Sequence, residues 1–297
     1  MKKGIYSLFL LSSCLLISCK ESKKQDDNTN ENNNASVIVM LGQSNMEGHT
    51  YSKYLSKTMG EEKANEYTKG YDDIKISYKC SMTLNSSNDE FVNVKLGEGT
   101  SVNQFGPEVG LAEYFHKENK ENIFIIKFAQ GATSIFNQWA PRSLGKPGAL
   151  YASSVEYVLS QVQKLEDMGY YPEIKAICWM QGEDDSNNDN YAQYGKYQRA
   201  LMKDLREDFL YYSRVGVIGF IDAGISDSMA WVHQKEINAQ KEEISKESEL
   251  NYYFSTIENK LKYNGEPAGS PDIYHYDSSS MIKLGNLFAE GVNNFLD

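Results

Sequence analysis

The chain has few of the features that mark several common protein classes. Its 297 residues include only four cysteines and six prolines, and no internal repeat runs through them. Because 40% of the residues are hydrophobic and 24% are charged, the composition excludes a fibrous, collagen-like or wholly disordered protein. The chain is long enough for a sizeable core, and its length alone fits one large α/β domain as well as two smaller domains.

Positive charge is also scarce. Lys and Arg number 30 against 41 Asp and Glu, so the formal net charge is −11 and the pI is about 5.0. No run of basic residues is long enough to follow a phosphate backbone, and we expect no nucleic-acid partner. The motifs HExxH, paired CxxC and GxxxxGK are missing, and the acidic stretch 183–189 lacks the glycine and final glutamate of an EF-hand loop. We therefore expect no metal and no other cofactor.

The N-terminus has the pattern of a targeting signal. Lys2 and Lys3 precede an apolar stretch, residues 5–17, which is too short to span a bilayer and has the length of a signal-peptide core. It ends in a small residue and Cys19, a sequence that resembles the lipobox of bacterial lipoproteins. We expect residues 1–18 to be a signal peptide and Cys19 to carry the lipid that anchors an exported lipoprotein to the outer membrane, on its periplasmic or cell-surface face. An ordinary secretory signal cleaved nearby is the alternative.

The stretch that follows the signal contains almost nothing that a core could bury. We expect residues 19–35 to be the lipidated cysteine and a disordered tether with a reach of roughly 20 Å. Cys80 and Cys178 are the cysteines left in the oxidising compartment, which permits a disulfide without implying one. The apolar surroundings of Cys178 favour a buried free thiol.

From residue 36 to the end, short apolar runs alternate with helical patterns, an order typical of a parallel α/β sheet in one domain, 36–297. Continuous apolar runs predict five strands covered on both faces, at 36–41, 123–128, 174–180, 215–221 and 250–257. Apolar residues at helical spacing predict helices over 151–165, 194–209 and 281–295. The weakly periodic segment 50–104 is interpreted as a long excursion over the sheet.

In an open parallel sheet, ligands bind beyond the carboxyl ends of the strands, so the residues that follow each predicted strand are the candidates for chemistry. Polar turns with glycine follow the first three predicted strands, at 42–48, 129–134 and 181–185. A further polar stretch, 272–275, precedes the last predicted helix. These four segments should meet at one edge of the sheet.

Together the four segments contain the parts of a serine hydrolase. Such an enzyme needs a hydroxyl nucleophile, an imidazole base, a carboxylate that orients the imidazole, and donors for the oxyanion. Ser44 offers the hydroxyl and His275 the imidazole, and Asp272 can reach back to that ring. Gly131 offers a backbone N–H and Gln181 a side-chain amide. Any one of these signals is weak, since a serine after a strand is most often a helix cap, but their joint occurrence predicts a serine hydrolase.

The turn around Ser44 does not have the Gly-x-Ser-x-Gly pattern of ordinary α/β-hydrolases, because Met46 stands at the second glycine position. The chain is instead similar to the SGNH hydrolases, in the branch of sialate O-acetylesterases and the acetylxylan esterases of carbohydrate esterase family six. Five blocks carry the resemblance in family order: GQSNMEG at 42–48, FGPEVGLA at 105–112, KFAQGATSIFNQW at 127–139, WMQGEDD at 179–185 and DIYHYDSSSMIKLG at 272–285. The resemblance implies a flavodoxin-like three-layer α/β/α fold and metal-independent ester hydrolysis.

The resemblance also implies roles for individual residues. Ser44 matches the nucleophile, His275 the base and Asp272 the orienting acid. The backbone N–H groups of Ser44 and Gly131 and the amide of Gln181 match the oxyanion hole. The family often has His where Met180 stands, so pocket contacts there differ from the family pattern.

Several neighbouring residues have roles that stay open at this stage. Glu183 is a rival for the orienting carboxylate, and its alternative is a supporting role. Four residues are candidates for supporting the site or contacting substrate: Gln43, Asn45, Glu183 and His49. Phe136 and Trp139 fit either an apolar platform for a sugar or the protein core.

The expected function is removal of O-acetyl groups from carbohydrates, either sialic acid or an acetylated polysaccharide such as xylan, through an acetyl-enzyme. Two alternatives remain. One is an esterase for another acyl group, resembling a lysophospholipase or thioesterase, and the other is a non-catalytic glycan-binding lipoprotein. The sequence specifies neither the sugar nor the oligomeric state.

Overall fold

The computed structural model describes residues 33–80, 85–213 and 216–296. The predicted signal peptide, Cys19 and most of the predicted tether lie outside these residues. The first strand, β1 (Asn34–Gly42), begins two residues inside the segment predicted as tether. Ala35 is buried there because the strand pairs with its neighbour at Pro172, so the folded domain starts slightly earlier than the apolar run suggested.

A seven-stranded sheet forms the centre of the domain. Its strands stand in the order β4-β3-β6-β1-β7-β8-β9, and all neighbours are parallel except β3 and β4. The bounds of the other six are β3 (Tyr71–Cys80), β4 (Val92–Val94), β6 (Ile123–Ala129), β7 (Tyr171–Met180), β8 (Gly219–Ala223) and β9 (Asn251–Phe254). A separate antiparallel pair joins β2 (Thr50–Tyr51) to β5 (Gln104–Phe105).

All five predicted strands are present, and their order β6-β1-β7-β8-β9 is that of flavodoxin-like sheets. The predicted number of strands was wrong, because β3 and β4 come from the segment interpreted as an excursion. In β3, buried Ile74 and Ile76 alternate with the more exposed Lys75, and Tyr78 precedes the exposed Lys79. That strand has an alternating pattern rather than a continuous apolar run.

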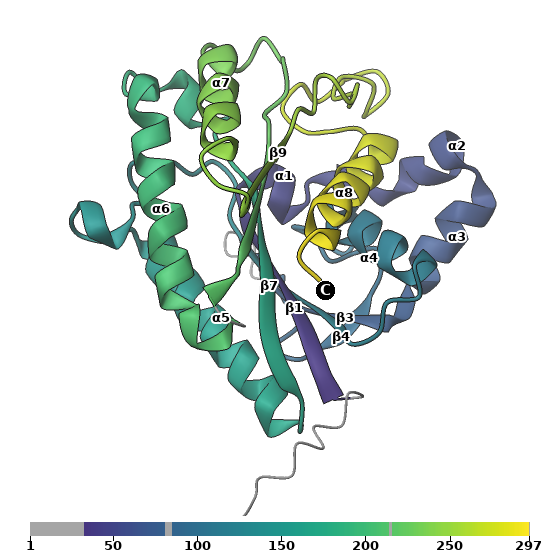
Figure 1. The fold of residues 1–297 in the computed structure, drawn as a ribbon. Helices are drawn as coiled ribbons and strands as arrows, with labels where there is room; N and C mark the ends of the chain where they lie inside the picture. The colour runs from purple at the N-terminus through teal and green to yellow at the C-terminus, as the bar shows by residue number, and fades with distance from the viewer. Residues whose placement is uncertain (1–32, 81–84, 214–215, 297) are drawn as a thin grey trace, which may run out of the picture. The chain divides into compact units, whose positions relative to one another are not determined.

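Helices cover both faces of the sheet, which confirms the three-layer α/β/α architecture. Figure 1 shows the sheet nearly edge-on, with α5, α6 and α7 on its left and α2, α3, α4 and α8 on its right. Their bounds are α2 (Leu55–Met59), α3 (Glu61–Lys69), α4 (Glu108–Lys117), α5 (Ala149–Asp167), α6 (Tyr194–Asp208), α7 (Gln234–Ser245) and α8 (Ser278–Asn293); the short α1 (Ser44–Glu47) follows β1. Short 3-10 turns lie at Ser52–Tyr54, Arg142–Leu144, Asp185–Asn187, Tyr191–Gln193 and Leu210–Tyr212.

The helices α4 and α8 pack unusually closely, through glycines. A Cβ on Gly110 would lie 2.0 Å from the carbonyl oxygen of Ile282, and one on Gly285 would lie 2.1 Å from that of Pro107. Only glycine fits at either position. Since α8 follows the segment 272–275, this contact helps to set where that segment lies.

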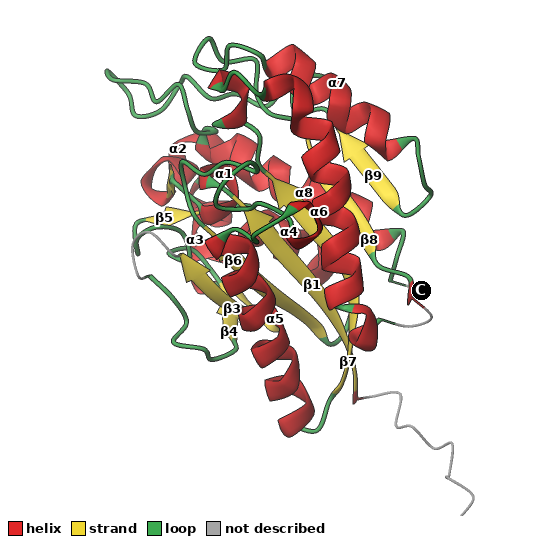
Figure 2. Ribbon diagram, turned by 90° about the vertical axis from the view of Figure 1, so that its left-hand side faces the viewer, coloured by secondary structure: helices red, strands yellow, loops and turns green. Residues whose placement is uncertain are grey.

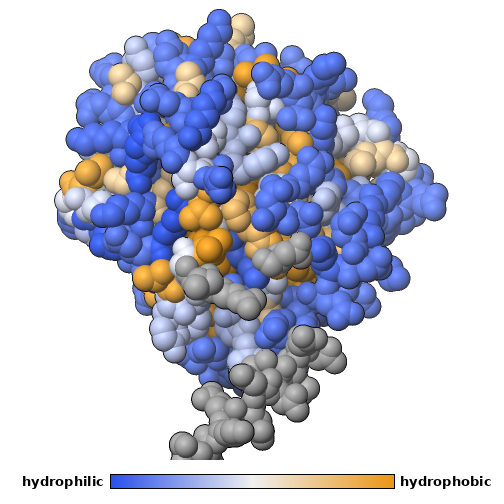
Figure 3. Space-filling view, in the orientation of Figure 1, coloured by the Kyte–Doolittle hydropathy of each residue, from blue (hydrophilic) through white to orange (hydrophobic). Residues whose placement is uncertain are grey.

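The surface seen in Figure 3 is mostly hydrophilic, with hydrophobic side chains gathered near its centre, in the region that Figure 1 shows between α6 and α8.

Both Cys80 and Cys178 are free and buried, which confirms the free-thiol prediction for Cys178. None of the described helices is both long and apolar enough to cross a membrane.

Candidate active site

The predicted site residues meet at the carboxyl ends of β1, β6 and β7. Figure 2 shows the long loops gathered at the end of the sheet toward which the strand arrows point. The strand β1 lies between β6 and β7, so the chain changes direction across the sheet at this point, where open α/β sheets bind ligands. A cavity of about 290 Å³ opens there, lined by Gln43, Ser44, His49, Gly131, Ala132, Asp184, Trp231, Tyr274 and His275.

Gly42 allows the sharp turn that brings Ser44 into this cavity. Its φ is +152°, and a Cβ at this position would lie 2.1 Å from the carbonyl oxygen of Met180. The next residue, Gln43, donates its N–H to that same oxygen at 2.9 Å. The chain can therefore leave β1 against the end of β7 and begin α1 at Ser44.

His275 and Asp272 form the hydrogen bond that their spacing predicted. The distance from His275 Nδ1 to Asp272 Oδ2 is 2.6 Å, and Asp272 Oδ1 accepts the N–H of Tyr274 at 2.8 Å. Partial burial opposes ionisation of Asp272, but the hydrogen bond from His275, its electrostatic attraction and the backbone N–H donors of Tyr274 and His275 together hold the pKa of this carboxyl below its usual value. Since a carboxylate only accepts, Nδ1 carries a proton, and in the neutral imidazole this tautomer gives Nε2 the lone pair.

Ser44 lies in the same cavity as His275 and is 8% exposed. Its hydroxyl makes no hydrogen bond to any residue in the described part of the chain. Nucleophile and base are often this loosely arranged in enzymes without substrate, and they approach more closely in the reacting complex.

His49 packs against the imidazole of His275. The two rings are stacked, with centroids 4.4 Å apart and planes 15° apart. The Nε2 atom of His49 lies 3.2 Å from Glu47 Oε2, so a buried carboxylate holds this second imidazole in place. His49 therefore borders both the cavity and the ring of His275.

Glu47 is a site residue that the sequence analysis missed. It is fully buried, and its Oε2 accepts the N–H of Gly131 at 2.7 Å. In this structure the Gly131 N–H, a predicted oxyanion donor, is thus engaged by a side chain. The only signal in the sequence is an acidic residue one helical turn after Ser44, a position that points it back toward the same cavity.

Gln181 lies at the predicted strand end but does not line the cavity. Its Nε2 donates to the carbonyl oxygen of Thr133 at 2.8 Å, to the carboxylate of Asp185 and to Gln43 Oε1 at 3.1 Å. The carbonyl oxygen of Thr133 and the carboxylate of Asp185 can only accept hydrogen bonds. The Gln181 amide must therefore turn its N–H₂ group, and not its oxygen, toward them. The N–H of Gly182 also points to Gln43 Oε1, at 3.4 Å, so the oxygen of the Gln43 amide lies on this side. Its own Nε2, which has no partner within the described residues, is left for the cavity.

Asn45 joins the turn of Ser44 to the loop of His275. Its Nδ2 donates to the carbonyl oxygen of Tyr274 at 3.2 Å and to Glu183 Oε1 at 2.9 Å, and its Oδ1 accepts the N–H of Tyr276 at 3.2 Å. Glu183 is fully buried, which raises its pKa, and it makes no hydrogen bond with His275. In this geometry Glu183 supports Asn45, and Asp272 is the carboxylate on the imidazole.

The apolar wall of the cavity differs from the candidates in the sequence. Trp139 is fully buried and packs edge-on against Trp179, and Phe136 packs against Tyr197, so neither lines the cavity. The aromatic side chains that do line it are Trp231 and Tyr274. Trp231 lies in a loop between β8 and α7 with no periodic pattern, and nothing in the sequence signalled its position.

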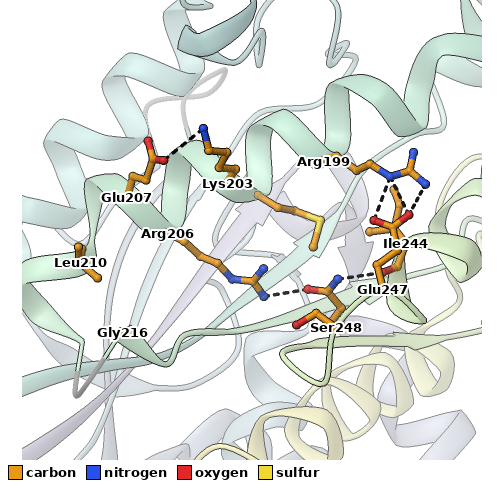
Figure 4. A pocket seen from close by; sticks show the side chains of 11 residues that line it. Arg199, Lys203, Arg206, Glu207, Leu210, Gly216, Ile244, Glu247 and Ser248 are labelled. Atoms are coloured by element: carbon orange, nitrogen blue, oxygen red, sulfur yellow. Dashed lines mark hydrogen bonds and ion pairs between the residues drawn. The ribbon is translucent and has the colours of Figure 1, made fainter.

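A larger cavity, of about 440 Å³, lies between α6 and the end of α7 (Figure 4). Arg199 makes a two-pronged ion pair with Glu247, and Lys203 pairs with Glu207. Arg206 donates to the carbonyl oxygens of Ile218 and Leu250 at 3.0 and 2.8 Å. The residues that line this cavity include no histidine or cysteine, and each of the charged side chains is already ion-paired or hydrogen-bonded within the protein.

Across the described ranges, no group of three or more His, Cys, Asp or Glu side chains is placed to hold a metal ion. The acidic stretch after β7 is used within the protein instead. Asp185 is buried and accepts hydrogen bonds from the hydroxyl of Ser134 and the N–H of Ile135. It thereby holds the loop after β6 against the loop after β7.

Comparison with known proteins gives the family. The family of carbohydrate esterases described as sialic acid-specific acetylesterases matches residues 34–294. No curated protein sequence matches the chain at a significant level. Similar solved structures include NanS (TM-score 0.62, 13% identity, 89% of this chain and 98% of that one), a protein from Arabidopsis thaliana (0.59, 18%, 88% and 99%) and a carbohydrate acetylesterase from Xanthomonas citri (0.58, 13%, 88% and 56%).

At these identities the structural likeness concerns the fold, which agrees with the predicted SGNH architecture. The family match covers nearly all of the described domain and confirms the resemblance seen in the five sequence blocks. The chain belongs to the sialic acid-specific acetylesterase family of carbohydrate esterases and is a carbohydrate O-acetylesterase.

Proposed function

We propose that this protein removes O-acetyl groups from a glycan by serine-based acyl transfer, through an acetyl-enzyme intermediate. The observation that carries the proposal is the hydrogen bond between His275 Nδ1 and Asp272 Oδ2, in the cavity that also holds Ser44. An imidazole oriented in this way presents Nε2 as a base beside a hydroxyl.

The reaction runs in two stages. Ser44 Oγ attacks the carbonyl carbon of the acetyl ester, and its proton passes to His275 Nε2. The tetrahedral intermediate collapses, the sugar oxygen leaves with that proton, and the acetyl group stays on Ser44. A water molecule then gives a proton to His275 and attacks the acetyl-enzyme, after which acetate leaves and Ser44 recovers its proton.

The oxyanion that forms in each stage needs donors in the cavity. Our proposal assigns this role to the N–H of Ser44, at the start of α1, and to Nε2 of Gln43. Gln181, which the family resemblance offered as a donor, orients the Gln43 amide instead, as its bonds to Thr133 and Asp185 support. The Gly131 N–H contributes when Glu47 releases it.

Acetate release by purified protein tests the proposal directly. The substrates are p-nitrophenyl acetate, O-acetylated sialic acid and acetylated xylan, and the critical variant is Ser44→Ala. We expect its kcat to fall by roughly 10³-fold or more on every substrate that the native protein cleaves. Ser248→Ala, in the larger cavity, is the matched control and should stay within twofold.

Two results would contradict this proposal. Native protein that binds acetylated glycan without releasing acetate would favour the glycan-binding alternative. Activity on long-chain acyl esters alone would favour the alternative of another acyl substrate.

We further propose that the chain is exported as a lipoprotein attached through Cys19, as the Leu-Ile-Ser-Cys sequence indicates. Radiolabelled palmitate should then be incorporated into native protein in a bacterial host and not into Cys19→Ser. Equal labelling of the two would contradict the assignment of the anchor.

A further inference from the structure

Two aromatic rings stand at the mouth of the catalytic cavity. Trp231 and Tyr274 both line it, and their ring centroids are 5.5 Å apart with planes at 57°. Tyr274 is 50% exposed. Beside Trp231 in its loop, Met229 and Val232 are 88% and 70% exposed, so this rim presents apolar surface to solvent.

Trp231 is held in place before any ligand arrives. Trp231 donates its indole N–H to Ser226 Oγ at 3.1 Å. Asn187 ties down the same loop, because it donates to the carbonyl oxygen of Ala230 at 2.9 Å and accepts the N–H of Val232 at 3.0 Å. A ring fixed in this way loses little conformational entropy when a ligand packs against it.

The charge of the cavity is the second observation. No lysine or arginine is among the described residues that line it, whereas the exposed Asp184 is. The imidazole of His49 is paired with Glu47, and that of His275 with Asp272. A site that binds a carboxylate normally offers arginine or lysine to it, and here the nearest fixed charge on the wall is negative.

We infer that Trp231 and Tyr274 form a subsite for an uncharged sugar, and that the enzyme deacetylates neutral glycans in preference to sialic acid. A pyranose has a face rich in C–H groups that packs against an aromatic ring, whereas the carboxylate of sialic acid meets Asp184 with no cation to balance it. This inference rests on the proposed function, since it concerns the substrate of the same site.

A matched pair of substrates isolates the effect of charge. O-acetylated sialic acid and its carboxyl methyl ester differ only in the carboxylate, and acetate release is measured for both. We expect kcat/KM to be roughly tenfold higher for the methyl ester at low ionic strength, with a smaller ratio in 0.5 M salt. In Asp184→Asn the ratio should also shrink.

A second comparison isolates the aromatic subsite. Acetylated xylo-oligosaccharide contains a sugar and p-nitrophenyl acetate does not. In Trp231→Ala we expect kcat/KM on the xylo-oligosaccharide, divided by kcat/KM on p-nitrophenyl acetate, to fall roughly tenfold. Most of this fall should come from a higher KM for the xylo-oligosaccharide. Tyr211→Ala is the matched control, because this exposed tyrosine lies in the turn after α6 and does not line the catalytic cavity.

The results distinguish failure of the inferred sugar subsite from failure of the proposed esterase function. The inference would be overturned if O-acetylated sialic acid lost its acetyl group as fast as the carboxyl methyl ester at low salt. An equal loss of activity on both substrates in Trp231→Ala would overturn it too. Native protein that cleaves none of the four substrates, p-nitrophenyl acetate included, would contradict the proposed function itself.

Discussion

The catalytic cavity and the cavity between α6 and α7 differ most clearly in how their polar groups are used. The larger, about 440 Å³, contains five charged side chains, and each of them has a partner within the protein. The smaller, about 290 Å³, holds an oriented imidazole, together with a hydroxyl and an amide N–H₂ that have no hydrogen-bond partner among the described residues. Unused hydrogen-bonding capacity therefore marks the site for chemistry better than volume does.

The position of each cavity in the sheet explains this difference. The smaller cavity lies beyond the carboxyl ends of β1, β6 and β7, where loops are free to present side chains. The larger lies near Gly216 and Asn251, which precede or begin β8 and β9. There Arg206 satisfies carbonyl oxygens near the strand starts, so its charge serves the fold.

The largest expected difference is between loss of the carboxylate that orients His275 and loss of a carboxylate in the larger cavity. Asp272→Asn should lower kcat by roughly 100-fold or more, because the amide cannot hold His275 in the tautomer that leaves Nε2 free. Glu247→Gln, which breaks the pair with Arg199, should leave kcat within twofold. Steady-state acetate release measures both, and equal losses would erase the distinction between the cavities.

The next largest effect concerns the oxyanion donor. Gln43→Met keeps the length of the side chain but removes its N–H groups, and kcat should fall by roughly 100-fold with little change in KM. Gln240→Met, at a partly buried glutamine of α7, is the control and should change kcat less than twofold. Full turnover in Gln43→Met together with a large loss in Gln181→Met would return the donor role to Gln181.

Arg206→Met should affect stability and not activity. The change removes donors to the carbonyl oxygens of Ile218 and Leu250 and to Asn251 Oδ1. We expect the free energy of unfolding, measured in urea, to fall by about 1–3 kcal/mol, with kcat/KM within twofold of native. A loss of activity without a loss of stability would make the larger cavity functional after all.

The smallest expected effect is on how the stability of the fold depends on pH, through the carboxyl of Glu183. Burial raises the pKa of this carboxyl, so the folded protein binds its proton more tightly than the unfolded chain does. Its contribution to stability is present below the ordinary glutamate pKa of 4.5 and is lost as the pH rises through the folded value. The melting temperature of Glu183→Gln minus that of the native protein should therefore increase between pH 4 and pH 8. A difference that stays constant over this range would contradict this account.

Much of the fold followed from simple patterns in the sequence. Continuous apolar runs correctly marked β1, β6, β7, β8 and β9, because strands buried on both faces need apolar side chains at successive positions. The strand β3 escaped because its residues alternate, and β4 because it spans only three residues. The position of the site followed from where strands end.

The details of the site depended on contacts that periodicity does not carry. Glu47 and Gly131 are 84 residues apart, and their hydrogen bond follows from the way β1 and β6 pair. Likewise, the direction of the Gln181 amide is set by Thr133, on another loop. Only the pairing of Asp272 with His275 was local enough to be predicted from spacing alone.

The bond between Asn45 and the carbonyl oxygen of Tyr274 spans 229 residues of chain. During synthesis, Ser44 emerges early and His275 among the last residues, so a growing polypeptide carries a nucleophile with no base to activate it. Catalysis therefore begins only when the final segment has docked onto the first strand. An acetate assay on this enzyme consequently reports completed folding, and a chain cut short before residue 275 would be inert however well its sheet had formed.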